Sequence, residues 1–141
     1  MVVYHYTSKS NLDSILKNGL KPTSRYETFT KLRKDVVFCW LSPSDNKIFS
    51  EDAVCLEVAV NENDCVVASM DYISLAMMYK YGGAKYGGMN IPVNERASSL
   101  CVELYEASAV PLSEYKEGQL FSPEVLVKGP IAPLNIKVYN C

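Results

Sequence analysis

The sequence predicts an α+β fold. Short apolar runs rich in β-branched and aromatic residues recur between polar turns, as is typical of strands, and two or three other segments have helical character. The chain has 141 residues, of which 48% are hydrophobic and 21% are charged, which argues against disorder. We therefore expect one domain, residues 1–141, whose strands form a split or sandwiched sheet.

The first predicted elements are a strand and the helix that follows it. Residues 2–7 combine valines and tyrosines and predict a buried strand. Ser8 or Ser10 can cap a helix in which Leu12, Ile15 and Leu16 share one face. Gly19 follows Asn18 and supplies the stop signal for this helix.

The remaining elements are predicted from apolar runs and turn residues. Asp71 can cap a second helix over residues 72–79, which is apolar on most sides. Further strands are predicted over residues 36–41, 54–60, 65–68, 100–105, 125–127 and 136–139. The strand over 100–105 is predicted because its residues alternate in polarity.

His5 is the only histidine of the chain and lies in the first predicted strand. His5 and Thr7 are alternate residues, so their side chains should share one face, at a strand end that opens into a helix. Such a place suits ligand binding. The alternative is a histidine that forms a hydrogen bond inside the core.

Glu124 stands at the entrance of the 125–127 strand, beside Pro123, which marks the start of that strand. We expect this carboxylate to be exposed enough to stay ionised and fixed enough to orient a ligand. The alternative is a solvated glutamate at a strand end.

Together these segments resemble the ADP-ribosyltransferase superfamily, in the branch of the DNA ADP-ribosyltransferase toxins (DarT) and the RNA 2′-phosphotransferases. That branch opens with a His-x-Thr strand, here His5-Tyr6-Thr7, and a helix like the one over residues 11–20. It ends with a Glu-Val-Leu-Val block like that of residues 124–133. The resemblance implies an ADP-ribosyltransferase-like split β-sheet sandwich. The matching blocks cover about the first and last twenty residues.

The resemblance implies NAD as co-substrate and needs no metal. Glu124 would stabilise the positive charge that develops on the ribose, and Arg33, ahead of the second strand, would assist it. The histidine motif would hold ribose hydroxyls, and an aromatic ring would pack on nicotinamide. The implied cofactor-binding residues are His5, Tyr6, Thr7, Trp40 and Tyr72, with Tyr79 another possible ring. For Arg33, a solvated surface arginine is the alternative.

The stretch 79–88 repeats Tyr-Gly-Gly and contains Tyr79, Tyr81 and Tyr86. Paired glycines and tyrosines suit an adaptable loop that faces the acceptor, which could be single-stranded nucleic acid or a protein. The alternative is a connection with anchoring aromatic residues.

Three functional classes remain open. The first is a mono-ADP-ribosyltransferase used as a toxin or in conflict between a virus and its host. The second is an RNA 2′-phosphotransferase, which we disfavour because Lys9 is the only cation near His5 in the sequence. The third is a catalytically inactive binding module with the same fold.

Composition adds bounds on compartment and partners. The net charge of −2, without a basic run, argues against non-specific duplex binding. Five cysteines without metal-ligand spacing predict free thiols and a reducing cytoplasm. No apolar stretch reaches the length of a membrane span, so we expect no membrane partner.

Overall fold

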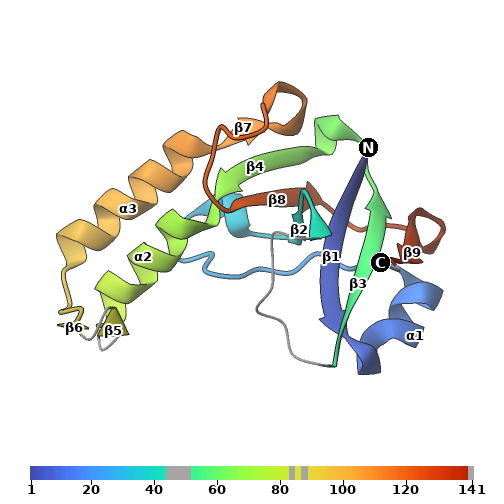
Figure 1. Cartoon of the computed structure of the whole chain (residues 1–141), viewed down its shortest axis with the longest axis horizontal. Helices are drawn as coiled ribbons and strands as arrows, with labels where there is room; N and C mark the ends of the chain where they lie inside the picture. The colour runs from blue at the N-terminus through green and yellow to red at the C-terminus, as the bar shows by residue number, and fades with distance from the viewer. Residues whose placement is uncertain (44–51, 83–84, 87–88, 140–141) are drawn as a thin grey trace.

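The computed structural model describes residues 1–43, 52–82, 85–86 and 89–139, and within these residues it confirms the α+β class. Its helices are α1 (Lys9–Asn18), α2 (Met70–Tyr81) and α3 (Glu95–Ser108). An antiparallel sheet has the strand order β7-β4-β8-β2-β1-β3-β9, and β5 pairs separately with β6 (Figure 1). The strands are β1 (Val2–Ser8), β2 (Val36–Trp40), β3 (Ala53–Ala59), β4 (Cys65–Ser69), β5 (Lys85–Tyr86), β6 (Met89–Asn90), β7 (Val110–Pro111), β8 (Pro123–Lys128) and β9 (Ile136–Val138).

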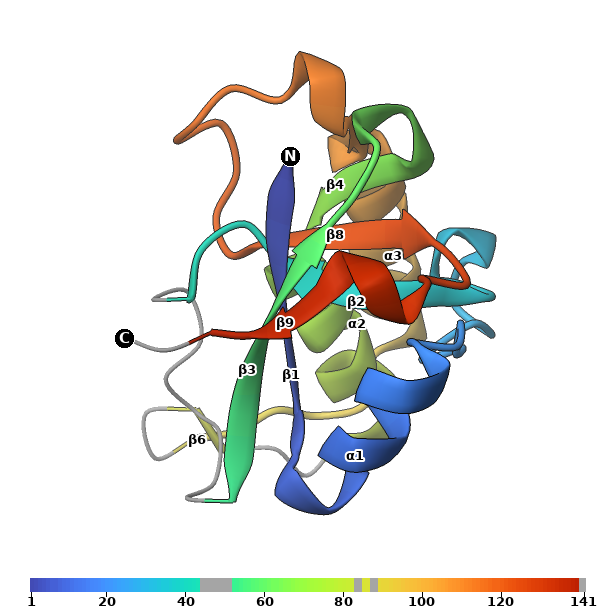
Figure 2. The same ribbon diagram turned by 90° about the vertical axis from the view of Figure 1, so that its right-hand side faces the viewer.

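The sheet is continuous but is joined narrowly at its centre. β1 pairs with β3 along its whole length, from Val2 opposite Ala59 to Ser8 opposite Ala53. The same strand meets β2 at a single residue pair, Tyr4 opposite Trp40. Figures 1 and 2 show the consequence: β1 and β3 run across the direction of β4 and β8.

Helices cover both faces of the sheet. α1 lies beside β1 and β3, and its Leu12 and Ile15 pack on a core that includes Val3 and Leu56. α2 and α3 pack against each other and cover the other face, where Ile73 and Tyr105 contact apolar residues of β4 and β8. The two cores are separated by the sheet, so alternate residues of β8 enter different cores.

The prediction of a strand over residues 100–105 is wrong, because these residues lie inside α3. Asn94 caps this helix: its side-chain oxygen accepts a hydrogen bond from the backbone N–H of Ala97 at 3.0 Å. The buried positions are Ser98, Cys101 and Tyr105, spaced as one face of a helix packed against α2. Leu100 and Leu104, whose apolar character suggested a strand, are exposed on the opposite side.

Other boundaries also differ from expectation. The N-cap of α2 is Ser69, and Asp71 lies within the first turn instead of capping it. The same helix continues to Tyr81, so Tyr79 and Tyr81 are helical residues rather than loop residues. The predicted stop of α1 at Gly19 is confirmed: its backbone N–H donates to the carbonyl of Ile15 at 2.8 Å.

Gly19 provides a test of how α1 is joined to the sheet. Its φ is +86°, and a Cβ at this position would lie 2.2 Å from the backbone oxygen of Ile131. Gly19→Ala should lower the free energy of unfolding by at least about 3 kcal/mol, because backbone strain and a backbone clash add. The matched control is Gly118, with φ of +84° and no atom within 4 Å, where alanine should cost about 1–2 kcal/mol. Urea denaturation measures both, and equal losses would contradict the clash.

Candidate functional site

Arg33 and Glu124 form a buried ion pair. Arg33 ends a short 3-10 turn (Lys31–Arg33) that Thr30 caps, its Oγ1 accepting from the N–H of Leu32 at 3.3 Å. Arg33 Nη1 donates to Glu124 Oε1. The structure thus brings together the two residues that were expected to act in catalysis, although they lie 91 positions apart in the chain.

Neither residue has the environment that the sequence suggested. Glu124 is 4% exposed and Arg33 is 1% exposed, so the expectation of an exposed glutamate is wrong and so is the alternative of a solvated arginine. The reason is strand order. β8 lies between β4 and β2, so Glu124 has Ala68 opposite it on one side and Trp40 on the other. The entrance of this strand is therefore inside the sheet.

Aromatic rings and hydrogen-bond acceptors surround the Arg33 guanidinium. Nε donates to the carbonyl of Arg25 at 2.9 Å, and Nη1 donates to the hydroxyl of Tyr105 at 3.1 Å. Nη1 also contacts Met70 Sδ at 3.7 Å. Its Cζ lies 5.6, 4.6 and 5.8 Å from the ring centroids of Tyr26, Phe38 and Tyr105, within the range of cation–π attraction.

The two charges of the pair shift each other's ionisation. Burial raises the pKa of Glu124, and the positive charges of Arg33 and Arg25 oppose this shift only in part. Burial acts to lower the pKa of Arg33, but the Glu124 carboxylate outweighs it and the pKa is raised. Glu124 is thus a carboxylate whose ionised form depends on its arginine neighbours.

The outer atoms of the pair remain available. Every fully buried side-chain nitrogen and oxygen of the described residues has a hydrogen-bond partner. Within the same part of the chain, Glu124 Oε2 and Arg33 Nη2 have none, so these atoms lie at the accessible edge of the pair. One carboxylate oxygen is anchored and the other is free to accept a hydrogen bond.

His5 is anchored to β2, the strand that lies between β1 and the strand carrying Glu124. Its Nδ1 is 2.8 Å from the carbonyl oxygen of Phe38, which can only accept, so Nδ1 carries the proton. Burial lowers the pKa of His5, against the Phe38 hydrogen bond, so the ring is neutral near pH 7 and Nε2 is an acceptor. Nε2 has no partner among the described residues and is not fully buried. Phe38, whose carbonyl holds His5, and Trp40, which lies opposite Glu124, are two positions apart on β2, about 6.6 Å along the strand.

Arg25 is a site residue that the sequence did not single out. Its side chain is exposed, and its charge adds to the lowering of the pKa of His5 and opposes the raising of the pKa of Glu124. Lys9 is the only cation near His5 in the sequence, and the fold adds an arginine that lies 20 positions away along the chain. Its backbone is held by Arg33, through the bond from Nε to the Arg25 carbonyl.

The other residues expected to bind the cofactor differ in their hydrogen-bond partners and in their position relative to Glu124. Thr7 Oγ1 accepts from Asn11 Nδ2 at 3.3 Å. Tyr6 alternates with His5 along β1, and its hydroxyl donates to the carbonyl of Pro43. Trp40 is half-buried and is directly opposite Glu124, whereas Tyr72, on α2, is half-buried and packs against the core that includes Ile73 and Tyr105. Trp40 is therefore the aromatic residue that the strand register places beside the carboxylate.

The tyrosines expected to face an acceptor lie at the far end of α2. Tyr79 is half-buried, and its carbonyl accepts from the backbone N–H of Asn94 at 2.8 Å. Tyr81 is the last residue of α2 and is 67% exposed. Tyr86 lies in β5, and its side chain is outside the described part. In Figure 1 this end of the α2–α3 hairpin projects away from the sheet.

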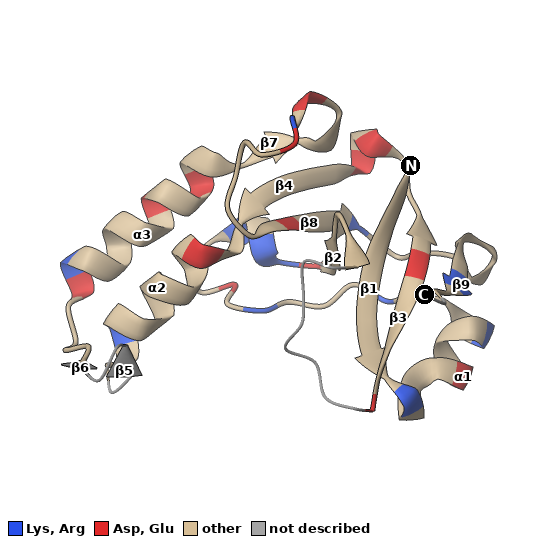
Figure 3. Cartoon of the chain, viewed as in Figure 1, with Lys and Arg blue, Asp and Glu red and all other residues tan. Residues whose placement is uncertain are grey.

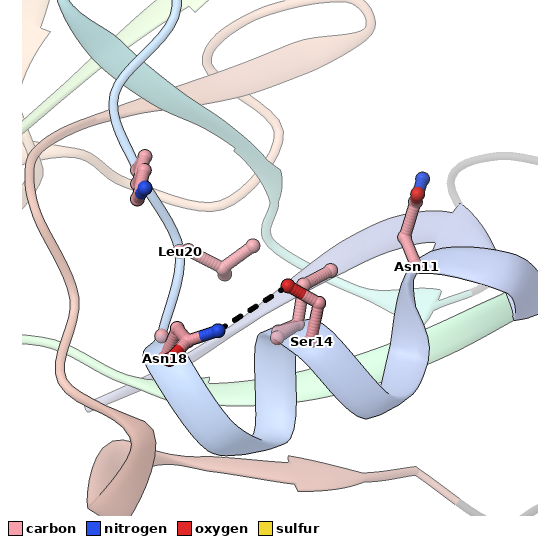
Figure 4. A pocket seen from close by; sticks show the side chains of 7 residues that line it. Asn11, Ser14, Asn18 and Leu20 are labelled. Carbon is pink, nitrogen blue, oxygen red and sulfur yellow. Dashed lines mark hydrogen bonds between the residues drawn. The ribbon is translucent and has the colours of Figure 1, made fainter.

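Two surface hollows lie near these elements, and neither contains the ion pair. One, of about 250 Å³, runs along α1, where Asn18 Nδ2 donates to Ser14 Oγ (Figure 4). The other, of about 600 Å³, lies between the basic stretch before β2 and acidic α3, which Figure 3 shows in contrasting colours. Its lining residues are Glu27, Thr28, Phe29, Thr30, Lys31, Leu32 and Glu106.

The described residues contain no group of three or more histidine, cysteine or acidic side chains placed to hold a metal ion. Cys39, Cys65 and Cys101 are free thiols, and burial raises the pKa of Cys65 to about 11. Among the described helices, none combines the length and apolar character needed to cross a bilayer.

Comparisons with protein-family models, curated proteins and solved structures found no match.

Arg33→Met should lower the free energy of unfolding by about 3–5 kcal/mol, because it leaves the Glu124 charge buried without its partner. The loss should shrink as the pH falls, since Glu124 without Arg33 is more easily protonated. The matched control is Lys34→Met at the neighbouring exposed position, which should change stability by no more than about 0.5 kcal/mol. Chemical denaturation at several pH values measures both, and equal effects would show that the ion pair does not support the fold.

His5 can be followed by NMR without assignment, because it is the only histidine. Its lowered pKa predicts a titration midpoint below about 6.5 and a neutral ring with the proton on Nδ1 at pH 7. The stability that this group contributes should be complete above about pH 6.5 and should be lost as the pH falls through the folded-state pKa. A midpoint at or above 6.5 in the folded protein would rule out the buried, Phe38-bonded ring.

Proposed function

We propose that this chain is an NAD-dependent mono-ADP-ribosyltransferase that modifies a macromolecular acceptor. The observation that carries the proposal is the Glu124 carboxylate, with Oε1 held by Arg33 and Oε2 free, beside a neutral histidine at the narrow joint of the sheet. A carboxylate held in this way is suited to stabilise positive charge on a ribose.

The residues around the pair fit the chemistry of NAD. His5 Nε2 can accept a hydrogen bond from a ribose hydroxyl, and Thr7 Oγ1 can bond a second one. Arg25 offers an exposed guanidinium for phosphate oxygens. Trp40, opposite Glu124, offers a ring for the flat, cationic nicotinamide. A hydroxyl acceptor, a carboxylate and an aromatic face are thus present on neighbouring strands, with a cation in the segment before β2.

The reaction breaks the bond between ribose C1′ and the nicotinamide nitrogen, which leaves with the electron pair, while the acceptor atom bonds to C1′ and releases a proton to solvent. Glu124 Oε2 would accept from the adjacent 2′-hydroxyl and stabilise the developing positive charge. Arg33 would keep the carboxylate ionised and oriented through Oε1. Because burial raises the pKa of Glu124, the acid limb of the pH–rate profile should lie above the ordinary range for a glutamate.

The fold is consistent with a split-sheet sandwich of the ADP-ribosyltransferase kind. The single Tyr4–Trp40 pair divides the sheet into two groups of strands, with α1 on one face and the α2–α3 hairpin on the other. His5 belongs to one group and Glu124 to the other, so the proposed NAD site lies where the groups meet.

For the acceptor we propose single-stranded nucleic acid, with a protein as the other outcome of the test. The projecting end of the hairpin carries an exposed tyrosine, Tyr81, together with the cations Lys80 and Arg96. Stacking on an exposed tyrosine contributes roughly 1–3 kcal/mol per base. An enzyme of this kind would serve as a toxin, or in conflict between a virus and its host, within a cytoplasm that supplies NAD.

A second candidate function is a catalytically inactive binding module with the same fold. The specific observation that favours it is the 4% exposure of Glu124, since the same ion pair also stabilises the interior. RNA 2′-phosphotransfer, the remaining alternative, requires several cations around the histidine. Arg25 is the one cation whose charge acts on His5 among the described residues. Detection of ADP-ribose on an acceptor distinguishes the transferase from both of these alternatives.

The deciding experiment is incubation of the purified protein with labelled NAD and cell extract, followed by nuclease or protease digestion. Label that survives protease and is released by nuclease indicates nucleic acid, and the reverse indicates protein. Glu124→Gln should lower the transfer rate by about 10²–10³. Glu117→Gln, at an exposed glutamate, should not change it. Thermal melting must accompany each assay, because Glu124→Gln also weakens the buried pair.

Arg25→Gln gives a variant that leaves the buried pair intact, because Arg33 bonds only the backbone of residue 25. At a pH above the acid limb it should raise the KM for NAD and change kcat little, since it removes a phosphate contact. Loss of the Arg25 charge, which opposes the raised pKa of Glu124, should also move the acid limb to higher pH. Wild-type protein that is folded and transfers no label to any acceptor would favour the inactive module.

A further inference from the structure

We infer that Tyr105 is a positioning residue for the site: its buried hydroxyl fixes the Arg33 guanidinium in the orientation that anchors Glu124 Oε1. The role in catalysis rests on the function proposed above, whereas the effect on the ion pair does not. Tyr105 comes from α3, the one helix that the sequence pattern presented as a strand.

Three oxygen atoms, one of them the Tyr105 hydroxyl, accept hydrogen bonds from the Arg33 guanidinium. Nη1 carries two hydrogens and faces Glu124 Oε1, the Tyr105 hydroxyl at 3.1 Å and Met70 Sδ at 3.7 Å. The thioether is a weak acceptor, so Glu124 and Tyr105 take the two strong bonds. With Nε bonded to the Arg25 carbonyl, three oxygens then fix the plane of the guanidinium.

A tyrosine suits this position for an electrostatic reason. Burial raises the pKa of Tyr105, so its hydroxyl is neutral near pH 7 and does not compete with Glu124 for the charge of Arg33. Packing alone would be met by a phenylalanine, because a buried hydroxyl is costly unless it has a partner. The hydroxyl of this fully buried side chain has Arg33 as its partner.

Tyr105 is itself held firmly. Its backbone carbonyl accepts from Ser108 Oγ at 2.6 Å, and the same Oγ accepts from the backbone N–H of Ser69 at 3.3 Å. Ser69 Oγ in turn donates to the carbonyl of Phe121 at 2.7 Å, just ahead of the strand that carries Glu124. The hydroxyl of Tyr105 is thus placed by the same framework that places the carboxylate.

The consequence concerns the ionisation of Glu124. The titratable and charged groups that act with it are Arg33 from the turn, Arg25 from the exposed segment, Tyr105 from α3 and Cys39 from β2. Of these, Arg33 is the main opponent of the burial that raises the pKa of Glu124. If the hydroxyl is lost and Arg33 turns, the pKa of Glu124 should rise further.

The test compares Tyr105→Phe with Tyr26→Phe. Both rings face Arg33, at 5.8 and 5.6 Å, but only the Tyr105 hydroxyl accepts from it, so Tyr26→Phe is the matched control. The first readout is the titration of the Glu124 carboxyl by carbon-13 NMR, without NAD. Tyr105→Phe should move its midpoint to higher pH, and Tyr26→Phe should leave it unchanged.

The second readout is transfer activity. Tyr105→Phe should lower kcat about tenfold, with the acid limb at higher pH and the KM for NAD unchanged. In an Arg33→Lys background, which retains charge without the fork of donors, Tyr105→Phe should shift the carboxyl titration no further. Thermal melting of each variant shows that these comparisons are made on folded protein.

An unchanged Glu124 titration in folded Tyr105→Phe would overturn the inference and leave Tyr105 a packing residue. An equal shift in Tyr26→Phe would overturn it as well. A shift specific to Tyr105→Phe, in a protein whose wild type transfers no ADP-ribose, would support the positioning of the ion pair and reject the proposed function.

Discussion

The buried charge pair between Arg33 and Glu124 is the interaction on which the rest of the structure depends. Removing two charges from water costs several kcal/mol for each, and the cost is recovered only if the remaining donors and acceptors are also satisfied. Here the Arg25 carbonyl and the Tyr105 hydroxyl satisfy the arginine. The segment before β2, the strand β8 and the helix α3 must therefore be in place together.

The same pair gives the site its chemical character. A carboxylate deep in a protein becomes neutral unless a cation faces it, and a neutral carboxyl cannot stabilise an oxocarbenium-like ribose. Arg33 keeps the charge, and the outer carboxylate oxygen remains accessible. His5, on the other side of the narrow joint between β1 and β2, does not compete for the arginine, because its Nδ1 is committed to the Phe38 carbonyl.

Local sequence signals predicted the elements well where one face or one stop residue decides the outcome. The valine-rich first strand and the end of α1 at Gly19 are of this kind. The prediction for residues 100–105 failed because a short, mostly apolar run fits a strand or part of a helix equally well. The cap residue Asn94 and the helical spacing of Ser98, Cys101 and Tyr105 were the better signals.

The candidate site was predictable only in part, since burial depends on neighbours that are distant in the chain. The sequence indicated His5, Glu124 and Arg33 through the family resemblance, but the burial of Glu124 follows from the strand order β4-β8-β2. The approach of Arg25 to His5 likewise results from tertiary structure, because the two are 20 positions apart.

The buried pair also has a consequence for how the sequence changes during evolution. Loss of Arg33 or Glu124 alone would be penalised through folding, so selection for stability preserves both even in a lineage whose chemistry no longer matters. In a protein with such a pair, retention of the glutamate among relatives is evidence that the interior must stay folded and is not evidence of activity. Loss of activity would first be visible as substitutions at exposed site positions such as Arg25.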